Sequence, residues 1–517
     1  MRTEAVFAIL SALGCLVIGV SAEDQSQTQE NEERSWGVGP GNRKPWVDSK
    51  KLQADIKTEN LVANLRALND IAFANGGNRA FGLPGYAASV DYVWKRISKV
   101  PGTRAWKQDF DALFSQVVSI DLKVGGEDIY VHGLTYSPST PAEGITAEIV
   151  AGPEGAAGCN DEAYADLDVA GKIVLVQRFR CPTGGTLAGR LLPAARAGAA
   201  AVLIYHDLTT NATAGSLSAP NPEHVPGGFI NKADGERIKD RLAAGEKLEA
   251  HFQQTQVVET RTTQNLFVET VDGDPENVIV LGAHLDSVQA GPGINDDGSG
   301  TSLILELFLA FSKYRAKNKV RFAWWGAEES GLLGSKHYCS TLDPREADRI
   351  LAYLNFDMVA KGYIGVGDAD GSTHGSVAPP GSEVIERLYH EYFASKNITV
   401  TPAIITNGSD YASFWSILNK PFGFLHTGTG VEQDPCYHQA CDTIDNPDPD
   451  THTKNAKAAA HILSILAMNG ARLIPKGAPI NATTLAAIRT RDLTPDLVQI
   501  EELEALGERH LGCGHDI

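Results

Sequence analysis

The sequence has little positive charge for its size, and after its first twenty residues it has no long hydrophobic run. Its 45 Lys and Arg residues face 64 Asp and Glu residues, which gives a net charge of −19 at pH 7. This balance argues against nucleic acid and anionic membrane surfaces as partners. The missing second apolar run argues against a membrane anchor. What remains is a soluble globular protein of 517 residues, long enough for more than one domain.

The N-terminus has the pattern of a secretory signal peptide. Arg2 supplies a positive start, an apolar stretch follows, and Val20-Ser21-Ala22 forms a small-residue cleavage site. We therefore expect residues 1–22 to be a signal peptide and polar residues 23–45 a disordered leader or propeptide. The mature protein is expected to be secreted to the extracellular space, with the vacuole as the alternative, and to be a monomer.

Cysteine is scarce, with seven residues, of which Cys15 lies in the signal. The other six could pair in 15 ways. Closeness in sequence favours Cys436 with Cys441 and Cys159 with Cys181, and leaves Cys339 and Cys513 open. Four N-x-[ST] sequons fit secretion from a eukaryotic cell, and we expect glycans at Asn211, Asn397 and Asn481 but not at Asn407.

The pattern of apolar residues divides the rest of the chain into segments. Residues 46–117 begin a main domain and have a helical pattern from Leu52 to Val100, whereas residues 118–258 contain short β-branched runs typical of a separate β-rich insert. From 259 to 474, strand candidates such as 277–285, 320–325, 350–359 and 421–428 alternate with helix candidates at 300–316, 331–342, 383–396 and 453–468. Such alternation predicts an α/β fold with a mostly parallel sheet covered by helices. Residues 475–517 form a C-terminal tail with helical propensity.

Polar residues gather where the predicted strands of this region end. His284 and Asp286 end the first strand, Glu328 and Glu329 follow the next, and Asp357 follows the third. Two further candidates lie in loops: Asp296 in "GINDDGSG" and His438 in "CYHQAC". Ligands of open α/β sheets bind at the carboxyl ends of the strands, so we expect these side chains to meet.

Two imidazoles with three carboxylates suit zinc. We expect two zinc ions that share Asp296, with His284 and Asp357 on one ion and Glu329 and His438 on the other. Glu328 is then available as a general base and acid. Asp286 is expected to orient the His284 ring, and Tyr437 to donate a hydrogen bond to a developing oxyanion.

Each of these features has an ordinary structural explanation when taken alone. An H-x-D at a strand end is more often structural, "DDGSG" could be a turn before a helix, and adjacent glutamates could be solvated. His438 could merely belong to a disulfide loop. Their occurrence at consecutive strand ends favours the metal site.

The motifs "GAHLDSV", "GPGINDDGSGT", "RFAWWGAEESGLLGSKHY", "YLNFDM" and "CYHQACDT" resemble those of the co-catalytic di-zinc aminopeptidases, such as aminopeptidase Y and secreted bacterial leucyl aminopeptidases. The resemblance covers about residues 260 to 470. It implies a phosphorylase/hydrolase-like fold, peptide substrates, the same five zinc ligands, Glu328 as the base, and a cis peptide bond between Asp296 and Asp297. The insert resembles a protease-associated domain, whose usual disulfide matches Cys159 and Cys181.

The sequence departs from this family near the substrate pocket. Gly408 stands where some relatives have an arginine, and His426 stands where a pocket phenylalanine is usual. We expect a broad, apolar-leaning pocket of the leucine type, formed by Tyr411, Phe414, Phe424 and His426.

Three other functions fit parts of the same pattern. A carboxypeptidase of this fold, like glutamate carboxypeptidase, would need basic residues to hold a carboxylate, and "ITNGSDYASF" has none. A glutaminyl cyclase would be unusual with a protease-associated insert. A catalytically silent binding scaffold, as in the transferrin receptor, would have lost metal ligands, and none is lost here.

Overall fold

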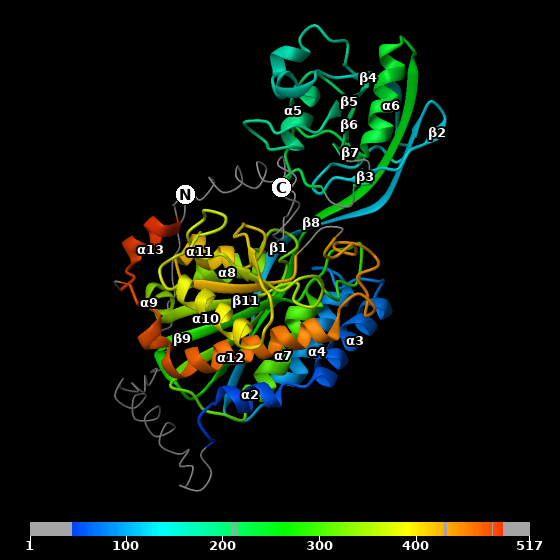
Figure 1. The fold of residues 1–517 in the computed structure, drawn as a ribbon. Helices are drawn as coiled ribbons and strands as arrows, with labels where there is room; N and C mark the ends of the chain where they lie inside the picture. The colour runs from blue at the N-terminus through cyan, green and yellow to red at the C-terminus, as the bar shows by residue number, and fades with distance from the viewer. Residues whose placement is uncertain (1–43, 208–210, 213–214, 429–431, 478, 490–517) are drawn as a thin grey trace, which may run out of the picture. The chain divides into compact units, whose positions relative to one another are not determined.

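The computed structural model describes residues 44–207, 211–212, 215–428, 432–477 and 479–489. The predicted signal peptide, almost all of the leader and the tail from residue 490 lie outside this part (Figure 1). Within it, no helix is both long and apolar enough to cross a lipid bilayer.

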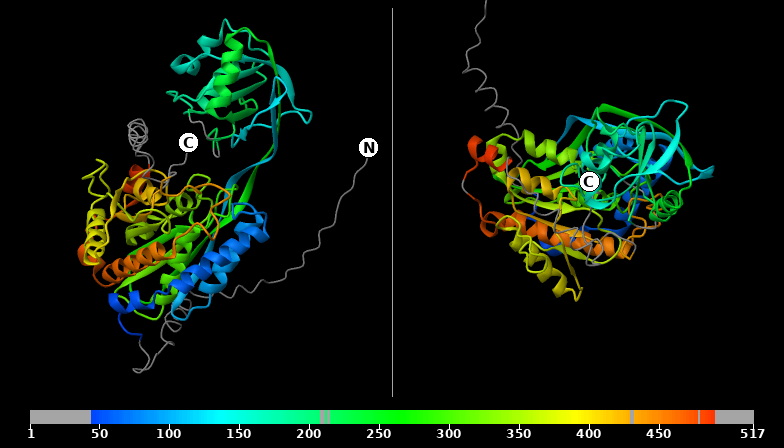
Figure 2. Two further views of the ribbon diagram at one scale, coloured as in Figure 1. Left: turned by 45° about the vertical axis from the view of Figure 1, so that its right-hand side comes forward. Right: turned by 90° about the horizontal axis from the view of Figure 1, so that it is seen from above.

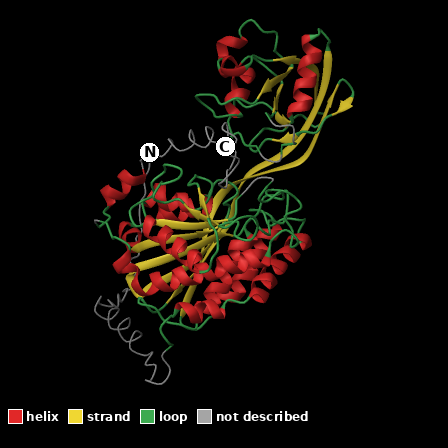
Figure 3. Cartoon of the chain, in the orientation of Figure 1, coloured by secondary structure: helices red, strands yellow, loops and turns green. Residues whose placement is uncertain are grey.

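One half of the sheet belongs to the main domain and has the strand order β13-β12-β14-β11-β9-β10-β8. Its central strands β14, β11, β9 and β10 run parallel, while β8 is antiparallel to β10 and β12 is antiparallel to β14. The predicted α/β fold with a mostly parallel centre is therefore confirmed (Figure 3). The strand bounds are Leu248–Thr270 (β8), Asp274–His284 (β9), Asn318–Trp325 (β10), Ile350–Phe356 (β11), Gly365–Gly367 (β12), Thr401–Ala403 (β13) and Phe422–His426 (β14).

The central strands are apolar on both faces because helices cover both. Successive side chains of a strand point to opposite faces, so Ile279 and Leu281 enter one core while Val278 and Val280 enter the other. The two helical layers can be followed in Figures 1 and 2. The first core is covered by α2 (Ser49–Asp55), α3 (Thr58–Ala74), α4 (Pro84–Ile97), α7 (Gly298–Phe311), α10 (Ser382–Ser395) and α12 (Pro449–Leu473). The second is covered by α8 (Leu333–Thr341), α9 (Pro344–Arg349), α11 (Tyr411–Leu418) and α13 (Ala482–Arg489).

The insert continues the same sheet beyond β8, in the order β8-β4-β5-β6-β7-β3. The disulfide Cys159–Cys181 closes its loops, as predicted. Its remaining elements are β2 (Glu127–Asp128), β3 (His132–Gly133), β4 (Ile145–Ala151), β5 (Ile173–Gln177), β6 (Ala201–Tyr205), β7 (Gly227–Ile230), α5 (Ala188–Arg196), α6 (Lys232–Ala243) and the 3-10 helices η1 (Gly155–Cys159) and η2 (Asp161–Tyr164).

Strand β1 (Thr103–Val124) pairs with β8 along almost its whole length, from Thr103 opposite Thr270 to Val124 opposite Ala250. The predicted insert boundaries at 118 and 258 fall inside these two strands. The pairing register shifts between Val117 and Ser119, next to the first of those boundaries. The hydrogen-bonded ladder continues across position 118, but Phe110 and Phe114 before it pack in one hydrophobic cluster and Leu122 and Val124 after it in another.

The sequons predicted to carry glycans are accessible in the described part of the chain. Asn211, Asn397 and Asn481 are exposed, whereas Asn407 is half-buried. Asn481 also caps α13, because its Oδ1 accepts the Thr484 N–H at 2.9 Å. These exposures fit the predicted pattern of glycosylation, which stays a prediction.

Candidate active site

The polar residues predicted at the strand ends lie at one edge of the sheet. His284 is the last residue of β9, Glu328 and Glu329 follow β10, and Asp357 follows β11. These strands are parallel neighbours, so their carboxyl ends coincide. His438 reaches the same place from the loop between β14 and α12.

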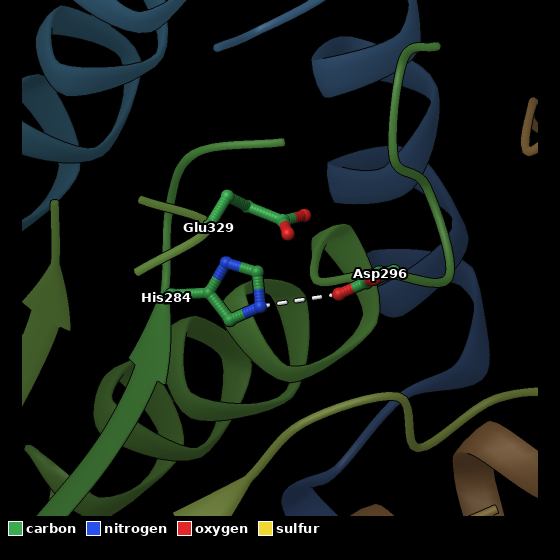
Figure 4. A group of neighbouring side chains, drawn as sticks. All are labelled: His284, Asp296 and Glu329. Atoms are coloured by element: carbon green, nitrogen blue, oxygen red, sulfur yellow. Dashed lines mark hydrogen bonds and ion pairs between the residues drawn. The ribbon is translucent and has the colours of Figure 1, made fainter. Parts of the chain in front are cut away.

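Asp296 lies between the two histidines. Its Oδ1 is 3.1 Å from His284 Nε2, and its Oδ2 is 3.1 Å from His438 Nε2. Figure 4 shows His284, Asp296 and Glu329 gathered around this point. A second carboxylate accompanies each histidine: Asp357 Oδ1 lies 3.5 Å from His284 Nε2, and Glu329 Oε2 lies 3.1 Å from His438 Nε2.

The charges at this site favour a bound cation. Burial alone would lower the pKa of His284 and of His438, but the surrounding carboxylates raise both well above the usual value. Glu329 Oε1 and Asp357 Oδ1 are buried and have no hydrogen-bond partner among the described residues. Buried carboxylate oxygens normally have a partner or a metal. The residues present therefore fit divalent metal ions, and their mixed N/O donors suit zinc.

Glu328 lies beside this set of residues. Its Oε2 is 3.8 Å from His284 Nε2, and the residue is buried. Burial raises the pKa of Glu328 well above its usual value, although the nearby His284 lowers it. A carboxylate with a raised pKa can both take up and release a proton near neutral pH.

Asp286 explains how two glutamates are held side by side. Its Oδ1 accepts the Glu328 N–H at 3.1 Å, and its Oδ2 accepts the Glu329 N–H at 3.2 Å. His284 Nδ1 is 3.1 Å from the Asp286 carbonyl oxygen and 3.7 Å from Asp286 Oδ1. The predicted orienting contact thus comes mainly from the backbone of Asp286, and its side chain fixes the glutamate turn.

Sequence reasoning missed the residues that hold the Asp296 loop against the His438 loop. Asp442 accepts the N–H groups of Asn295 and Asp296, at 2.8 and 3.0 Å. Asp434 accepts the Asn295 side-chain amide at 2.7 Å and the Cys436 N–H at 2.9 Å. The predicted disulfide Cys436–Cys441 lies between these two anchors. Only the acidic residues flanking "CYHQAC" hinted at this role.

Arg79, from the segment between α3 and α4, binds the loop that leads to Asp296. This fully buried guanidinium donates to the carbonyl oxygens of Leu285, Pro292 and Gly293, the second at 2.9 Å. The backbone N–H of Arg79 donates to Ser287 Oγ at 2.9 Å. Arg79 therefore satisfies backbone acceptors that would otherwise be buried without a donor. Nothing in the local sequence singles out this arginine.

Asp297 caps α7 and connects it to the strand ends. It accepts hydrogen bonds from the N–H groups of Gly300, at 2.7 Å, His284, at 3.2 Å, and Met358, at 3.2 Å. The Asp296–Asp297 peptide bond is cis, as the family resemblance predicted.

The predicted substrate residues occupy different environments. Tyr411, Phe424 and His426 line a cavity beside Asp357 of ≈ 10 Å³, which is about the space of one water molecule. Phe414 does not line it: its ring stacks on Tyr353 with 3.8 Å between centroids, inside the second core. The Phe414 ring therefore packs against the sheet, and its role in a substrate pocket stays a prediction. Tyr437 stacks on the His438 ring, also with 3.8 Å between centroids.

Comparison with known proteins places this arrangement in a family. Residues 265–463 match peptidase family M28, and residues 145–238 match the PA domain. Leucine aminopeptidase 2 of Arthroderma otae is 36% identical over 422 residues, which cover 78% of this chain and 83% of that protein. The chain belongs to peptidase family M28.

Two bacterial proteins extend this membership. An aminopeptidase of Pseudomonas aeruginosa is 35% identical over 505 residues, covering 89% of this chain and 91% of that protein. The solved structure of the aminopeptidase from Aneurinibacillus sp. strain AM-1 has a TM-score of 0.67 and 26% identity, covering 84% of this chain and 98% of that chain. The predicted enzyme class, a metallo-aminopeptidase with a protease-associated insert, is thereby confirmed.

Proposed function

We propose that this M28 enzyme removes N-terminal residues from peptides with a carboxylate-bridged pair of zinc ions. The observation that carries the proposal is the position of Asp296. Each of its oxygens faces a separate histidine, and each histidine has its own additional carboxylate. One carboxylate between two such sets is the arrangement that two-metal hydrolases use.

His284 and Asp357 would hold one zinc ion, Glu329 and His438 the other, and Asp296 both. When bound, zinc polarises the peptide carbonyl and makes water more acidic. Glu328 accepts a proton from the attacking water and donates it to the departing amine. Tyr437, beside His438, is proposed to donate a hydrogen bond to the oxygen of the tetrahedral intermediate.

Cleavage at the N-terminus is favoured over cleavage at the C-terminus by the residues near Asp357. The segment 405–414, which carries Ser409 beside Asp357 and the predicted pocket residue Tyr411, has no lysine or arginine that could hold a substrate carboxylate. The names of the fungal relatives point to a leucine-type preference. The predicted signal peptide and the two disulfides support secretion, since disulfides persist in oxidising compartments.

The test compares leucine p-nitroanilide with its N-acetylated form, each with and without a zinc chelator. We expect cleavage of the free-amine substrate alone, loss of activity with chelator, and recovery on adding zinc. Cleavage of the acetylated form at a similar rate, or activity insensitive to chelation, would contradict the proposal.

The proposed pocket makes a prediction for His426. Its Nδ1 donates to the Asp357 carbonyl oxygen at 3.0 Å, and burial lowers its pKa, so the ring is neutral. His426→Phe replaces the polar imidazole with an apolar ring. We expect the ratio of kcat/KM for Leu p-nitroanilide over Gln p-nitroanilide to rise by roughly 2- to 10-fold, which corresponds to the free energy of one hydrogen bond. Tyr363→Phe, in the segment between β11 and β12, serves as the control. An unchanged substrate ranking would exclude His426 from the pocket.

A further inference from the structure

A chain of buried hydrogen bonds leads from the centre of the sheet to Asp357. Trp325 Nε1 is 2.9 Å from Tyr353 Oη, which is 2.8 Å from Asn355 Oδ1. Asn355 Nδ2 is 2.8 Å from Ser409 Oγ, which is 2.6 Å from Asp357 Oδ2. Each of these residues is at most 3% exposed.

The residue types at the two ends fix the direction of every bond. An indole can only donate a hydrogen bond, and an ionised carboxylate can only accept one. Tyr353 therefore accepts from Trp325 and donates to the Asn355 carbonyl, which turns the Asn355 amide toward Ser409. The Ser409 hydroxyl then donates a hydrogen bond to Asp357. Burial raises the pKa of Tyr353 well above its usual value, so its hydroxyl keeps the proton that it donates.

Strand geometry explains how these side chains meet. Tyr353, Asn355 and Asp357 are two residues apart, so they project from one face of β11 and its continuation. Trp325 is on β10, and β9 lies between the two strands. Gly282 is the β9 residue at the crossing: a Cβ there would overlap both Tyr353 Oη and Trp325 Nε1. Its missing side chain leaves room for the first hydrogen bond, and the stacked Phe414 ring holds Tyr353 in place.

We propose that Tyr353 and Asn355 are positioning residues for zinc, because they make Ser409 hold Asp357 Oδ2 and so turn Oδ1 toward the metal. Asp357 Oδ1 is the atom that lies 3.5 Å from His284 Nε2 and has no hydrogen-bond partner among the described residues. Without the Tyr353 hydroxyl, the Asn355 amide can turn its carbonyl oxygen toward Ser409. The Ser409 hydroxyl can then donate its hydrogen bond to Asn355 instead of Asp357. The inference rests on the proposed zinc centre.

The test is Tyr353→Phe, which removes one hydroxyl and keeps the ring. The matched control is Tyr389→Phe on α10, another fully buried tyrosine, whose hydroxyl has no hydrogen-bond partner among the described residues. Zinc affinity is measured by competition with a chromophoric chelator, and the melting temperature of each metal-free protein reports folding. Removing the orienting partners of a metal ligand typically weakens metal binding by about 10- to 100-fold.

We expect Tyr353→Phe to release one of the two zinc ions about 10- to 100-fold more readily, with lower kcat and unchanged KM, and to alter the visible spectrum of the cobalt-substituted protein. Tyr389→Phe should match the wild type in zinc affinity, kcat, KM and cobalt spectrum. Asn355→Asp, which cannot donate to Ser409, should reproduce the loss if Tyr353→Phe folds poorly. Equal zinc affinities and equal cobalt spectra for the wild type, Tyr353→Phe and Asn355→Asp would overturn the inference.

The same experiment separates this inference from the proposed function. A wild-type protein that binds zinc but cleaves no aminopeptidase substrate would contradict the proposed function. The zinc affinities of the variants would still decide whether Tyr353 and Asn355 position Asp357. A wild-type protein that binds no zinc would overturn both.

Discussion

Replacing Glu328 with glutamine is expected to lower kcat for leucine p-nitroanilide by about 10²- to 10⁴-fold, the usual contribution of a general base. Glutamine has nearly the same shape but cannot accept a proton. The Asp286 carboxylate binds the backbone N–H of residue 328, so the turn should persist in the variant. The zinc content should remain that of the wild type, as measured by elemental analysis alongside the steady-state rates.

The adjacent glutamate supplies the control. Glu329 Oε2 lies 3.1 Å from His438 Nε2, so Glu329→Gln should weaken zinc binding, whereas Glu328→Gln should not. The same substitution at two neighbouring residues should therefore lower kcat in Glu328→Gln and weaken zinc binding in Glu329→Gln. If Glu328→Gln keeps more than a tenth of the wild-type kcat, the role of general base belongs elsewhere.

Replacing Asp296 with asparagine is expected to abolish the proposed pairing of two zinc ions. An amide is neutral and has a single oxygen, so it bridges two cations far less well than a carboxylate, and its NH₂ group would face one of the histidines now 3.1 Å away. We expect at most one zinc ion per chain. Metal ions contribute several kcal/mol to such reactions, so kcat/KM should fall by at least about 10³-fold. Zinc content and kcat/KM are measured on the same preparation.

Asp368→Asn is a suitable control for this variant. Asp368 is as buried as Asp296 and follows strand β12, but its carboxylate accepts the His374 and Thr373 N–H groups of a turn. This variant should keep the wild-type zinc content and rate even if its stability falls. Asp296→Asn protein that still holds two zinc ions would show that the bridge lies elsewhere.

Much of the site follows from sequence because parallel strands end together. Once strands ending at His284, Trp325 and Phe356 are recognised, the polar residues after them must share one edge of the sheet. Two cysteines close in sequence similarly indicated the loop that carries His438. Local spacing is sufficient here, since each residue is placed by its own strand or loop.

The supporting residues could not be found in this way. Arg79 precedes the Asp296 loop by about 200 positions, and its partners are backbone carbonyls, which every residue has. The contacts of Phe414 could not be predicted for a related reason. A helical pattern shows that this ring lies on an apolar face of α11, but whether that face meets substrate or the sheet depends on packing.

The sequence by itself determined the fold class, the order of the strand ends and the set of residues available for zinc, because apolar periodicity and strand direction are local properties. The tertiary structure alone decided which oxygen of Asp296 faces which histidine, how the β1–β8 ladder crosses the edge of the insert, and that Trp325 reaches Tyr353 over Gly282. These features depend on distances between segments far apart in the chain. Side-chain periodicity specifies which face a residue occupies, whereas its partner on that face is selected by the packing of the whole domain.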